Sequence, residues 1–356
     1  MRITGNKGEW SELYALVKLL STGRLYAADE NTHKMDDTYF PIIKIIRNEH
    51  EYKHVEFIIN DDLAIEVYKN NEHIRDIESA TIKMYAELLY REIMGGSRRA
   101  FEVHDSASIM YDLECEKIKA PSSDKADITL QVHDINTGYE PICGFSIKSE
   151  LGNPPTLLNA SKSTNFIFEV HGIDDNLANH INDINSREKI KDRIAAILEK
   201  GTLSFKHAFS STFASNLMLI DSRMEEMMGH ILLRYYAFGE NSCEKIIEAL
   251  EIENPMGFPR RGFYRYKFKK LLCSIALGMV PSKEWNGIDD ANGGYIIVTE
   301  NGDCLAYHIY NRGAFEEYLM KNTRFEKAST SRHEYATIYT IGNKKYMNLN
   351  LQIRFA

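Results

Sequence analysis

Two segments in the middle of the chain alternate polar and apolar residues, and this alternation constrains the fold more than any other feature. Residues 125–132 and 144–150 both follow the period of a half-buried strand. The residues between them are rich in turn-forming types. The pattern predicts an antiparallel hairpin, with Asp127 on the polar face of one strand and Ser146 and Lys148 on the polar face of the other.

An acid and a lysine on neighbouring strands suit an enzyme that cleaves a phosphodiester with a divalent metal. The carboxylate binds the ion, while the lysine orients the attacking water and offsets phosphate charge. Two solvated strand faces would show the same residues by chance, and this alternative stays open on the hairpin alone.

An amphipathic helix is predicted over residues 6–20, with Leu13, Leu16, Val17 and Leu20 as its apolar stripe. Glu9 and Glu12 fall in its first turns, where the helix dipole favours acids. We assign Glu9 to that stabilising role.

The hairpin resembles the core of the PD-(D/E)xK nucleases, in an S-x-K variant. Asp127 matches the first acid and Lys148 the lysine, while Ser146 stands where a second acid is usual. In that superfamily the first core helix often begins with a glycine and presents a glutamate one turn later, which Gly8 and Glu12 resemble. A serine hydroxyl is a poor ligand for a hard cation, so Glu12 is the first candidate for the missing ligand. Glu150 and Glu169 are the alternatives.

Several longer strings carry a narrower resemblance: residues 5–12, 25–31, 145–149, 156–161, 164–166, 329–333 and 349–355. They resemble one family, the HpaII-type restriction endonucleases. The resemblance implies an α/β (α+β) fold: a restriction-endonuclease-like mixed central sheet flanked by helices, a largely helical later half and C-terminal β-hairpins. It also implies sequence-specific, magnesium-dependent cleavage of double-stranded DNA, with CCGG as the type target and a 5′-phosphate product. A palindromic target would suit a homodimer. The metal would be held by Asp127, Glu12 and the carbonyl of Ile147.

Two other functions remain open. One is a structure-selective nuclease or resolvase with the same fold, and the other is a DNA-binding protein without catalysis. The presence of both Asp127 and Lys148 argues against the second.

Composition fits a cytoplasmic enzyme. The 356 residues are 44% hydrophobic, without a signal peptide or an apolar run of transmembrane length. The five cysteines are widely separated, so a structural zinc site is not expected. The net charge of −8 requires a DNA-binding chain to concentrate its positive charge locally.

Three segments are candidates for DNA contact, each with a structural alternative. Residues 259–270 mix basic and aromatic side chains, which a solvated helix start above a core would also show. Residues 152–165 are rich in short polar side chains that donate to phosphate, or else form a loop in which Thr156 caps a helix. Residues 329–333 offer an arginine for guanine, unless it pairs with Glu326 or Glu334. The residues named for these roles are Arg260, Arg261, Arg265 and Lys267; Asn159, Ser161 and Thr164; and Ser331, Arg332 and His333. A shorter basic turn at 97–99 is a weaker candidate.

The order of patterns predicts one multi-lobed nuclease over residues 1–356. Its catalytic core would comprise about 1–30 and 75–210, and its recognition elements about 211–356. Further elements are short strands at 41–46, 55–59 and 64–68 in an insertion, helices at 78–94 and 315–320, a third core strand at 166–170, mainly helices over 175–277, and hairpins at 294–308 and 335–355.

Overall fold

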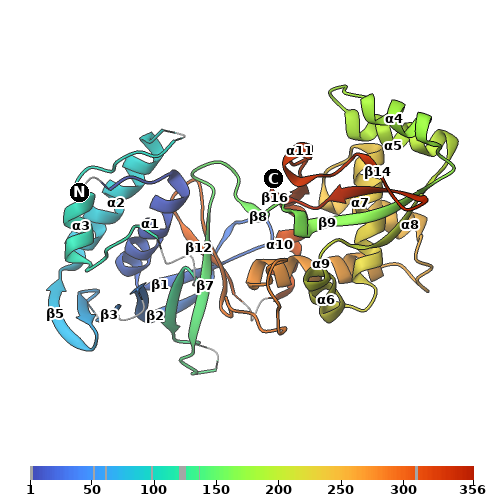
Figure 1. Cartoon of the computed structure of the whole chain (residues 1–356). Helices are drawn as coiled ribbons and strands as arrows, with labels where there is room; N and C mark the ends of the chain where they lie inside the picture. Colours follow the sequence, from blue (N-terminus) through green and yellow to red (C-terminus); the bar gives the residue numbers. More distant parts are fainter. Residues whose placement is uncertain are drawn as a thin grey trace. The chain divides into compact units, whose positions relative to one another are not determined.

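The computed structural model describes residues 3–50, 53–60, 62–97, 99–119, 126–135, 137–308 and 312–356 (Figure 1). Lys125, at the start of the predicted hairpin, and Arg98, in the predicted basic turn, lie outside the described residues. The chain divides into two compact units, Met1–Pro155 with Asp289–Tyr318, and Thr156–Ile288 with Leu319–Ala356. The described residues form a mixed α/β structure, which confirms the predicted class.

The first unit is built on one large mixed sheet. The β6–β7 hairpin lies at its centre, between β2 on one side and β11 on the other. Because β2 is long, its first half pairs with β1 and its second half with β6, so that the pairings close a ring through β12 and β11. The order is β1(Arg24–Ala28), β12(Cys304–His308), β11(Gly294–Val298), β7(Ile142–Ser149), β6(Ile128–Val132), β2(Lys34–His50), β3(Lys53–Ile59), β4(Ile65–Lys69) and β5(Glu72–Ile77).

The predicted first helix is α1(Lys7–Thr22), and it packs against α2(Ser79–Gly95) and β7 (Figure 1). Its bounds follow from the sequence, since Asn6 and Glu9 form a capping box at the start and Gly23 ends it with φ 61°. The apolar stripe expected from the sequence is buried in one core with β6 and β7. The smaller α3(Ser106–Asp112) belongs to the same unit, and α10(Arg312–Lys321) begins in it.

The second unit combines helices with two smaller antiparallel sheets. One sheet has the order β10(Thr202–Ala208), β9(Asn165–His171), β15(Lys344–Asn350), β14(Ile338–Ile341). The other contains β13(Thr323–Phe325), β16(Ile353–Phe355) and β8(Thr156–Leu158). The helices are α4(Asp175–Asp183), α5(Lys189–Lys200), α6(Ser211–Ile220), α7(Met224–Phe238), α8(Cys243–Glu253), α9(Phe263–Leu277) and α11(Thr330–His333), with the short turn η1(Lys162–Thr164).

One prediction about strand membership is wrong. Residues 166–170 do form a strand, but β9 pairs with β10 and β15 in the second unit. It cannot extend the catalytic hairpin, because β6 and β7 already pair on their outer edges with β2 and β11. The short strands predicted at 41–46, 55–59 and 64–68 extend the same large sheet, and the hairpin at 294–308 joins that sheet through a parallel pairing of β11 with β7.

Other local predictions are confirmed: the hairpin of 125–132 and 144–150 is observed as β6 and β7, the helix predicted at 78–94 is observed as α2, and the closing hairpin turns at Gly342. Among the described residues, no helix is both long and apolar enough to cross a membrane.

Candidate active site

The β6–β7 hairpin brings Asp127, Ser146 and Lys148 together as one hydrogen-bonded chain. Residue 128 pairs with residue 145 in the ladder, so Asp127 lies just before β6 and beside Ser146 of β7. The Lys148 Nζ donates to Ser146 Oγ at 3.1 Å. The Ser146 hydroxyl in turn donates to Asp127 Oδ2 at 3.0 Å. Ser146 is therefore the link between the predicted acid and the predicted lysine.

The backbone fixes the Asp127 carboxylate as well. Its own amide donates to the Phe145 carbonyl at 2.8 Å, and its Oδ2 accepts from the Ile147 amide at 2.7 Å. The hydrogen bonds that this carboxylate accepts from the described residues both end on Oδ2, which leaves Oδ1 for a further ligand. Lys148 is half-buried, with its Nζ 5.4 Å from the centre of the Tyr295 ring on β11.

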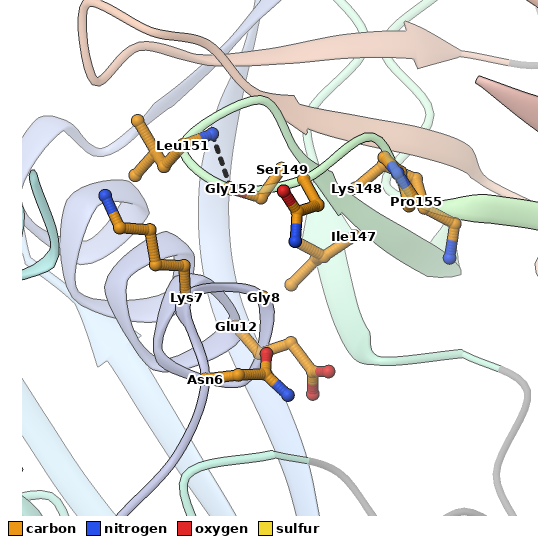
Figure 2. A pocket seen from close by; sticks show the side chains of 11 residues that line it. Asn6, Lys7, Gly8, Glu12, Ile147, Lys148, Ser149, Leu151, Gly152 and Pro155 are labelled. Atoms are coloured by element: carbon orange, nitrogen blue, oxygen red, sulfur yellow. Dashed lines mark hydrogen bonds between the residues drawn. The ribbon is translucent and has the colours of Figure 1, made fainter. Parts of the chain in front are cut away.

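A cleft of about 570 Å³ opens beside this hairpin, between the start of α1 and the end of β7. Figure 2 shows Glu12 from α1 and Ile147 and Lys148 from β7 around it, so two elements far apart in sequence supply its walls. The other lining residues are Asn6, Lys7, Gly8, Ser149, Leu151, Gly152, Asn153 and Pro155.

The two glutamates of the first helix have different surroundings. Glu9 completes the capping box, accepting from the Asn6 amide at 3.0 Å, and pairs with Lys119 at 2.7 Å. The Lys119 hydrogen bond is the main reason that the pKa of Glu9 is lowered. The stabilising role predicted for Glu9 is confirmed, whereas Glu12 lines the cleft.

The alternative ligands are less suited. The carboxylate of Glu169 is buried and already pairs with Lys206 at 2.9 Å and Lys344 at 3.1 Å within the second unit. Glu150 follows β7, and its pKa is raised, mainly by desolvation, with Glu300 adding a like charge. Across the part of the chain that the structure describes, no group of three or more His, Cys, Asp or Glu side chains is clustered to hold a metal.

Of the short polar residues predicted to contact DNA, Thr164 is a correction. It is fully buried, and its hydroxyl donates to the Ser161 carbonyl at 3.0 Å and accepts from the Ser161 amide at 3.0 Å. A DNA phosphate cannot reach a hydroxyl enclosed in this way. Asn159 is exposed, while Ser161 caps η1. Thr156 starts β8 instead of capping a helix.

The basic stretch is partly neutralised within the second unit. Arg265 pairs with Glu244 at 3.1 Å, and Lys267 pairs with Asp221. Arg260 and Arg261 are exposed at the start of α9, and the Arg260 guanidinium lies 5.8 Å from the Phe263 ring centre. Those two arginines are therefore the better placed of the four for phosphate contact.

The predicted recognition string forms α11, capped by Ser329. Ser331 and Arg332 are exposed, and His333 is half-buried, with its pKa lowered first by burial and then by the charge of Arg332. The acids proposed as alternative partners of Arg332 are engaged elsewhere: Glu334 pairs with Lys162 at 2.5 Å and Glu326 with Arg354 at 2.8 Å. The described part of the chain contains no ion pair to Arg332.

Buried polar residues that the sequence did not single out support this string. The amide of Asn165 donates to the His333 carbonyl at 2.9 Å, the amide of Asn348 to the Glu334 carbonyl at 3.2 Å, and Arg193 to the Ala336 carbonyl at 2.7 Å. Asn165 and Arg193 are remote in sequence from the carbonyl groups that they bind, so no local pattern could have revealed these two contacts. Lys7 and Asn6 were likewise missed as cleft residues, although both stand within the 5–12 string.

Comparison with known proteins agrees with the resemblance in the sequence. The model of the HpaII restriction endonuclease family matches residues 6–355. The type II restriction enzyme HpaII of Haemophilus parainfluenzae is 40% identical over 357 aligned positions, covering 99% of this chain and 98% of the relative. No solved structure matches the chain. A match over the full length of both proteins shows that the chain belongs to the HpaII restriction endonuclease family.

Proposed function

We propose that this protein is a type II restriction endonuclease that cleaves double-stranded DNA at a short palindrome of the CCGG type and leaves a 5′-phosphate. The observation that carries the proposal is the Lys148–Ser146–Asp127 hydrogen-bonded chain beside the cleft, in a protein that matches a type II restriction enzyme over its full length.

The oxygen donors at the site fit a hard divalent cation such as magnesium. Asp127 through Oδ1, the carboxylate of Glu12 and the main-chain carbonyl of Ile147 would hold it, since Glu12 and Ile147 line one cleft and the Asp127 carboxylate is bonded to the Ile147 amide. When bound, the ion would stabilise the negative charge that develops on the phosphate. These two carboxylates and one carbonyl are fewer protein ligands than an all-protein metal site has. This number fits an ion that also binds substrate and water.

The protein side chains would supply orientation and charge. Lys148, held by Ser146, would orient the attacking water and offset phosphate charge. Ser146 replaces the second strand acid with a neutral hydroxyl, so the lysine is positioned without an additional negative charge. Asp127 would keep its orientation through the Ile147 amide whether or not DNA is present.

For the fold, we propose that α1, β6, β7 and β11 form the restriction-endonuclease-like core. The long β2, its closure onto β1 and the β3–β5 extension would be additions to it. A palindromic target would be matched by a homodimer, with one active site for each strand.

For DNA recognition, we propose that Arg332 reads a guanine, with Ser331 and His333 beside it. Arg332 is exposed on a short helix whose carbonyl groups are anchored by buried side chains, an arrangement that suits precise reading of a base edge. Arg260 and Arg261 would contact phosphates, and Asn159 and Ser161 would help to position the backbone.

The test is digestion of plasmid DNA with the purified protein and magnesium, followed by sequencing of the ends. Discrete bands with one common end sequence are expected, and chelation of the metal should abolish them. A Lys148→Ala preparation serves as the control for contaminating nucleases. Smeared products or cutting only at junctions would favour a structure-selective nuclease, and DNA that is bound but intact would favour a binding protein; either result would overturn the proposal.

A further inference from the structure

Two serines connect the first helix to the catalytic strand. The Ser11 and Ser149 hydroxyl oxygens lie 2.7 Å apart, although the residues are 138 positions apart in sequence. Ser11 is completely buried in α1, and Ser149 is the last residue of β7. Each is the immediate neighbour of a candidate catalytic residue, since Glu12 follows Ser11 and Lys148 precedes Ser149.

The direction of this hydrogen bond follows from proton counting. A hydroxyl has one proton to donate and two lone pairs with which to accept. Ser11 Oγ donates its proton to the Lys7 carbonyl at 2.7 Å, so in the contact with Ser149 it must accept. Ser149 Oγ accepts from the Leu151 amide at 3.1 Å, the bond dashed in Figure 2, and its own proton is free to go to Ser11.

The result is one directed chain that runs from the Leu151 amide through Ser149 and Ser11 to the Lys7 carbonyl. It joins the segment after β7 to the first turn of α1. Lys7, Ser149 and Leu151 all line the cleft, and the chain therefore runs along its wall. Ser11 is not accessible to water, so water cannot replace a hydrogen bond that is lost at this position.

We propose that Ser11 and Ser149 are positioning residues, which set Glu12 on α1 at its working distance from Lys148 on β7. This inference rests on the proposed function, in which Glu12 binds the metal and Lys148 acts on the attacking water. Glu12 is held by a helix and Lys148 by a strand, and no element that is local in sequence connects the two. Catalysis is sensitive to displacements of about 1 Å, so a hydroxyl pair at this point controls the geometry without touching the substrate.

The test compares Ser149→Ala, Ser11→Ala, the double variant and the conservative Ser149→Thr. Ser149→Ala should lower the single-turnover cleavage rate roughly 10- to 100-fold and raise the magnesium concentration needed for half-maximal rate. Ser149→Thr keeps a hydroxyl and should restore most of the rate. The double variant should lose no more than the worse single variant, because both act through one contact.

The matched control is Ser21→Ala. Ser21 is also buried in α1, and its hydroxyl donates to the Lys18 carbonyl at 2.8 Å within the helix. Its loss should lower the melting temperature to a similar extent while leaving cleavage and magnesium dependence unchanged. Two readouts besides cleavage complete the set: magnesium binding by calorimetry without DNA should weaken in Ser149→Ala, and DNA binding without metal should stay within about twofold of wild type.

The outcomes separate the two proposals. Suppose that the wild type cleaves DNA and that Ser149→Ala shows a normal cleavage rate and normal magnesium binding. This result would overturn the positioning role and leave the proposed function intact. A loss of rate equal to that of Ser21→Ala would do the same, because it would report stability alone. An absence of wild-type cleavage would overturn the proposed function, and the positioning role with it. If Ser11→Ala does not fold, the half-buried Ser149 carries the test.

Discussion

Replacing Lys148 with alanine is the most direct perturbation of the proposed chemistry. The change removes the amine that donates to Ser146, but the Ser146 hydroxyl keeps its own bond to Asp127, and Asp127 keeps the Ile147 amide. The hairpin therefore retains its main internal contacts, and the protein should fold.

The structure indicates that the effect on chemistry exceeds the effect on stability. A hydrogen bond from a charged group contributes about 1.5–3 kcal/mol when enclosed, and for the half-exposed Lys148 we reduce this to about 1 kcal/mol. Loss of a group that activates or orients the nucleophile costs a factor of about 10²–10⁴ in rate, equivalent to about 3–5 kcal/mol of barrier. Metal-free DNA binding should fall only slightly, with the slope of its salt dependence reduced by about 0.9 for one lost phosphate contact.

The assay is single-turnover cleavage of a cognate duplex with enzyme in excess, beside binding measured without metal. Lys7→Ala is the matched control, since Lys7 lines the same cleft but donates to the Met94 carbonyl, away from the Ser146–Asp127 pair. It should weaken binding to a similar degree and slow cleavage far less. Cleavage by Lys148→Ala within about tenfold of wild type, or an equal loss in Lys7→Ala, would refute the assignment.

Three further predictions concern the metal and the DNA. Glu12→Gln should weaken magnesium binding in a calorimetric titration without unfolding the protein, whereas Glu9→Gln keeps an oxygen that can accept from the Asn6 amide in the capping box and should leave magnesium binding unchanged; the opposite pattern would move the ligand to another carboxylate. Arg332→Ala should cost about 1–3 kcal/mol of binding on the cognate duplex and much less on a scrambled one, and an equal loss on both would show that this arginine does not read a base. Arg261→Ala should weaken cognate and scrambled duplexes alike and reduce the slope of the salt dependence by about 0.9, as titrations at several salt concentrations would reveal; a loss confined to the cognate duplex would contradict a phosphate contact.

What the sequence predicted correctly was local. The apolar spacing from Leu13 to Leu20 predicted α1, and the structure ends that helix within the same stretch of chain, with a cap at Asn6 and an αL glycine at 23. The alternation around Asp127 and Lys148 likewise specifies β6 and β7, because a period of two and a short turn leave an antiparallel hairpin as the simple solution. Each of these signals arises within about twenty residues.

What it did not predict was the choice of neighbours in the sheets. β7 pairs in parallel with β11, which follows it by more than a hundred residues, and a parallel pairing leaves no turn motif between the strands. β9 has the apolar composition of a core strand, and only the occupation of both hairpin edges by β2 and β11 shows that it must belong to another sheet. Pairing over such separations depends on the packing of the whole unit, and residue patterns carry little of that information.

The same distinction separates the candidate DNA contacts. A threonine and an arginine are both good donors to nucleic acid, but a donor is available only if the fold has not already engaged it. The Thr164 hydroxyl donates to the carbonyl of Ser161, a contact between neighbours that a capping pattern could suggest. It also accepts from the side-chain amide of Asn350 at 3.2 Å, and no local pattern could predict that distant contact. Arg332 is the reverse case, because the acids nearest to it in sequence, Glu334 and Glu326, are held by the distant Lys162 and by Arg354. Contacts made far along the chain thus decide which of two equally plausible donors faces solvent, and that decision selects Arg332 over Thr164 as the residue to mutate first.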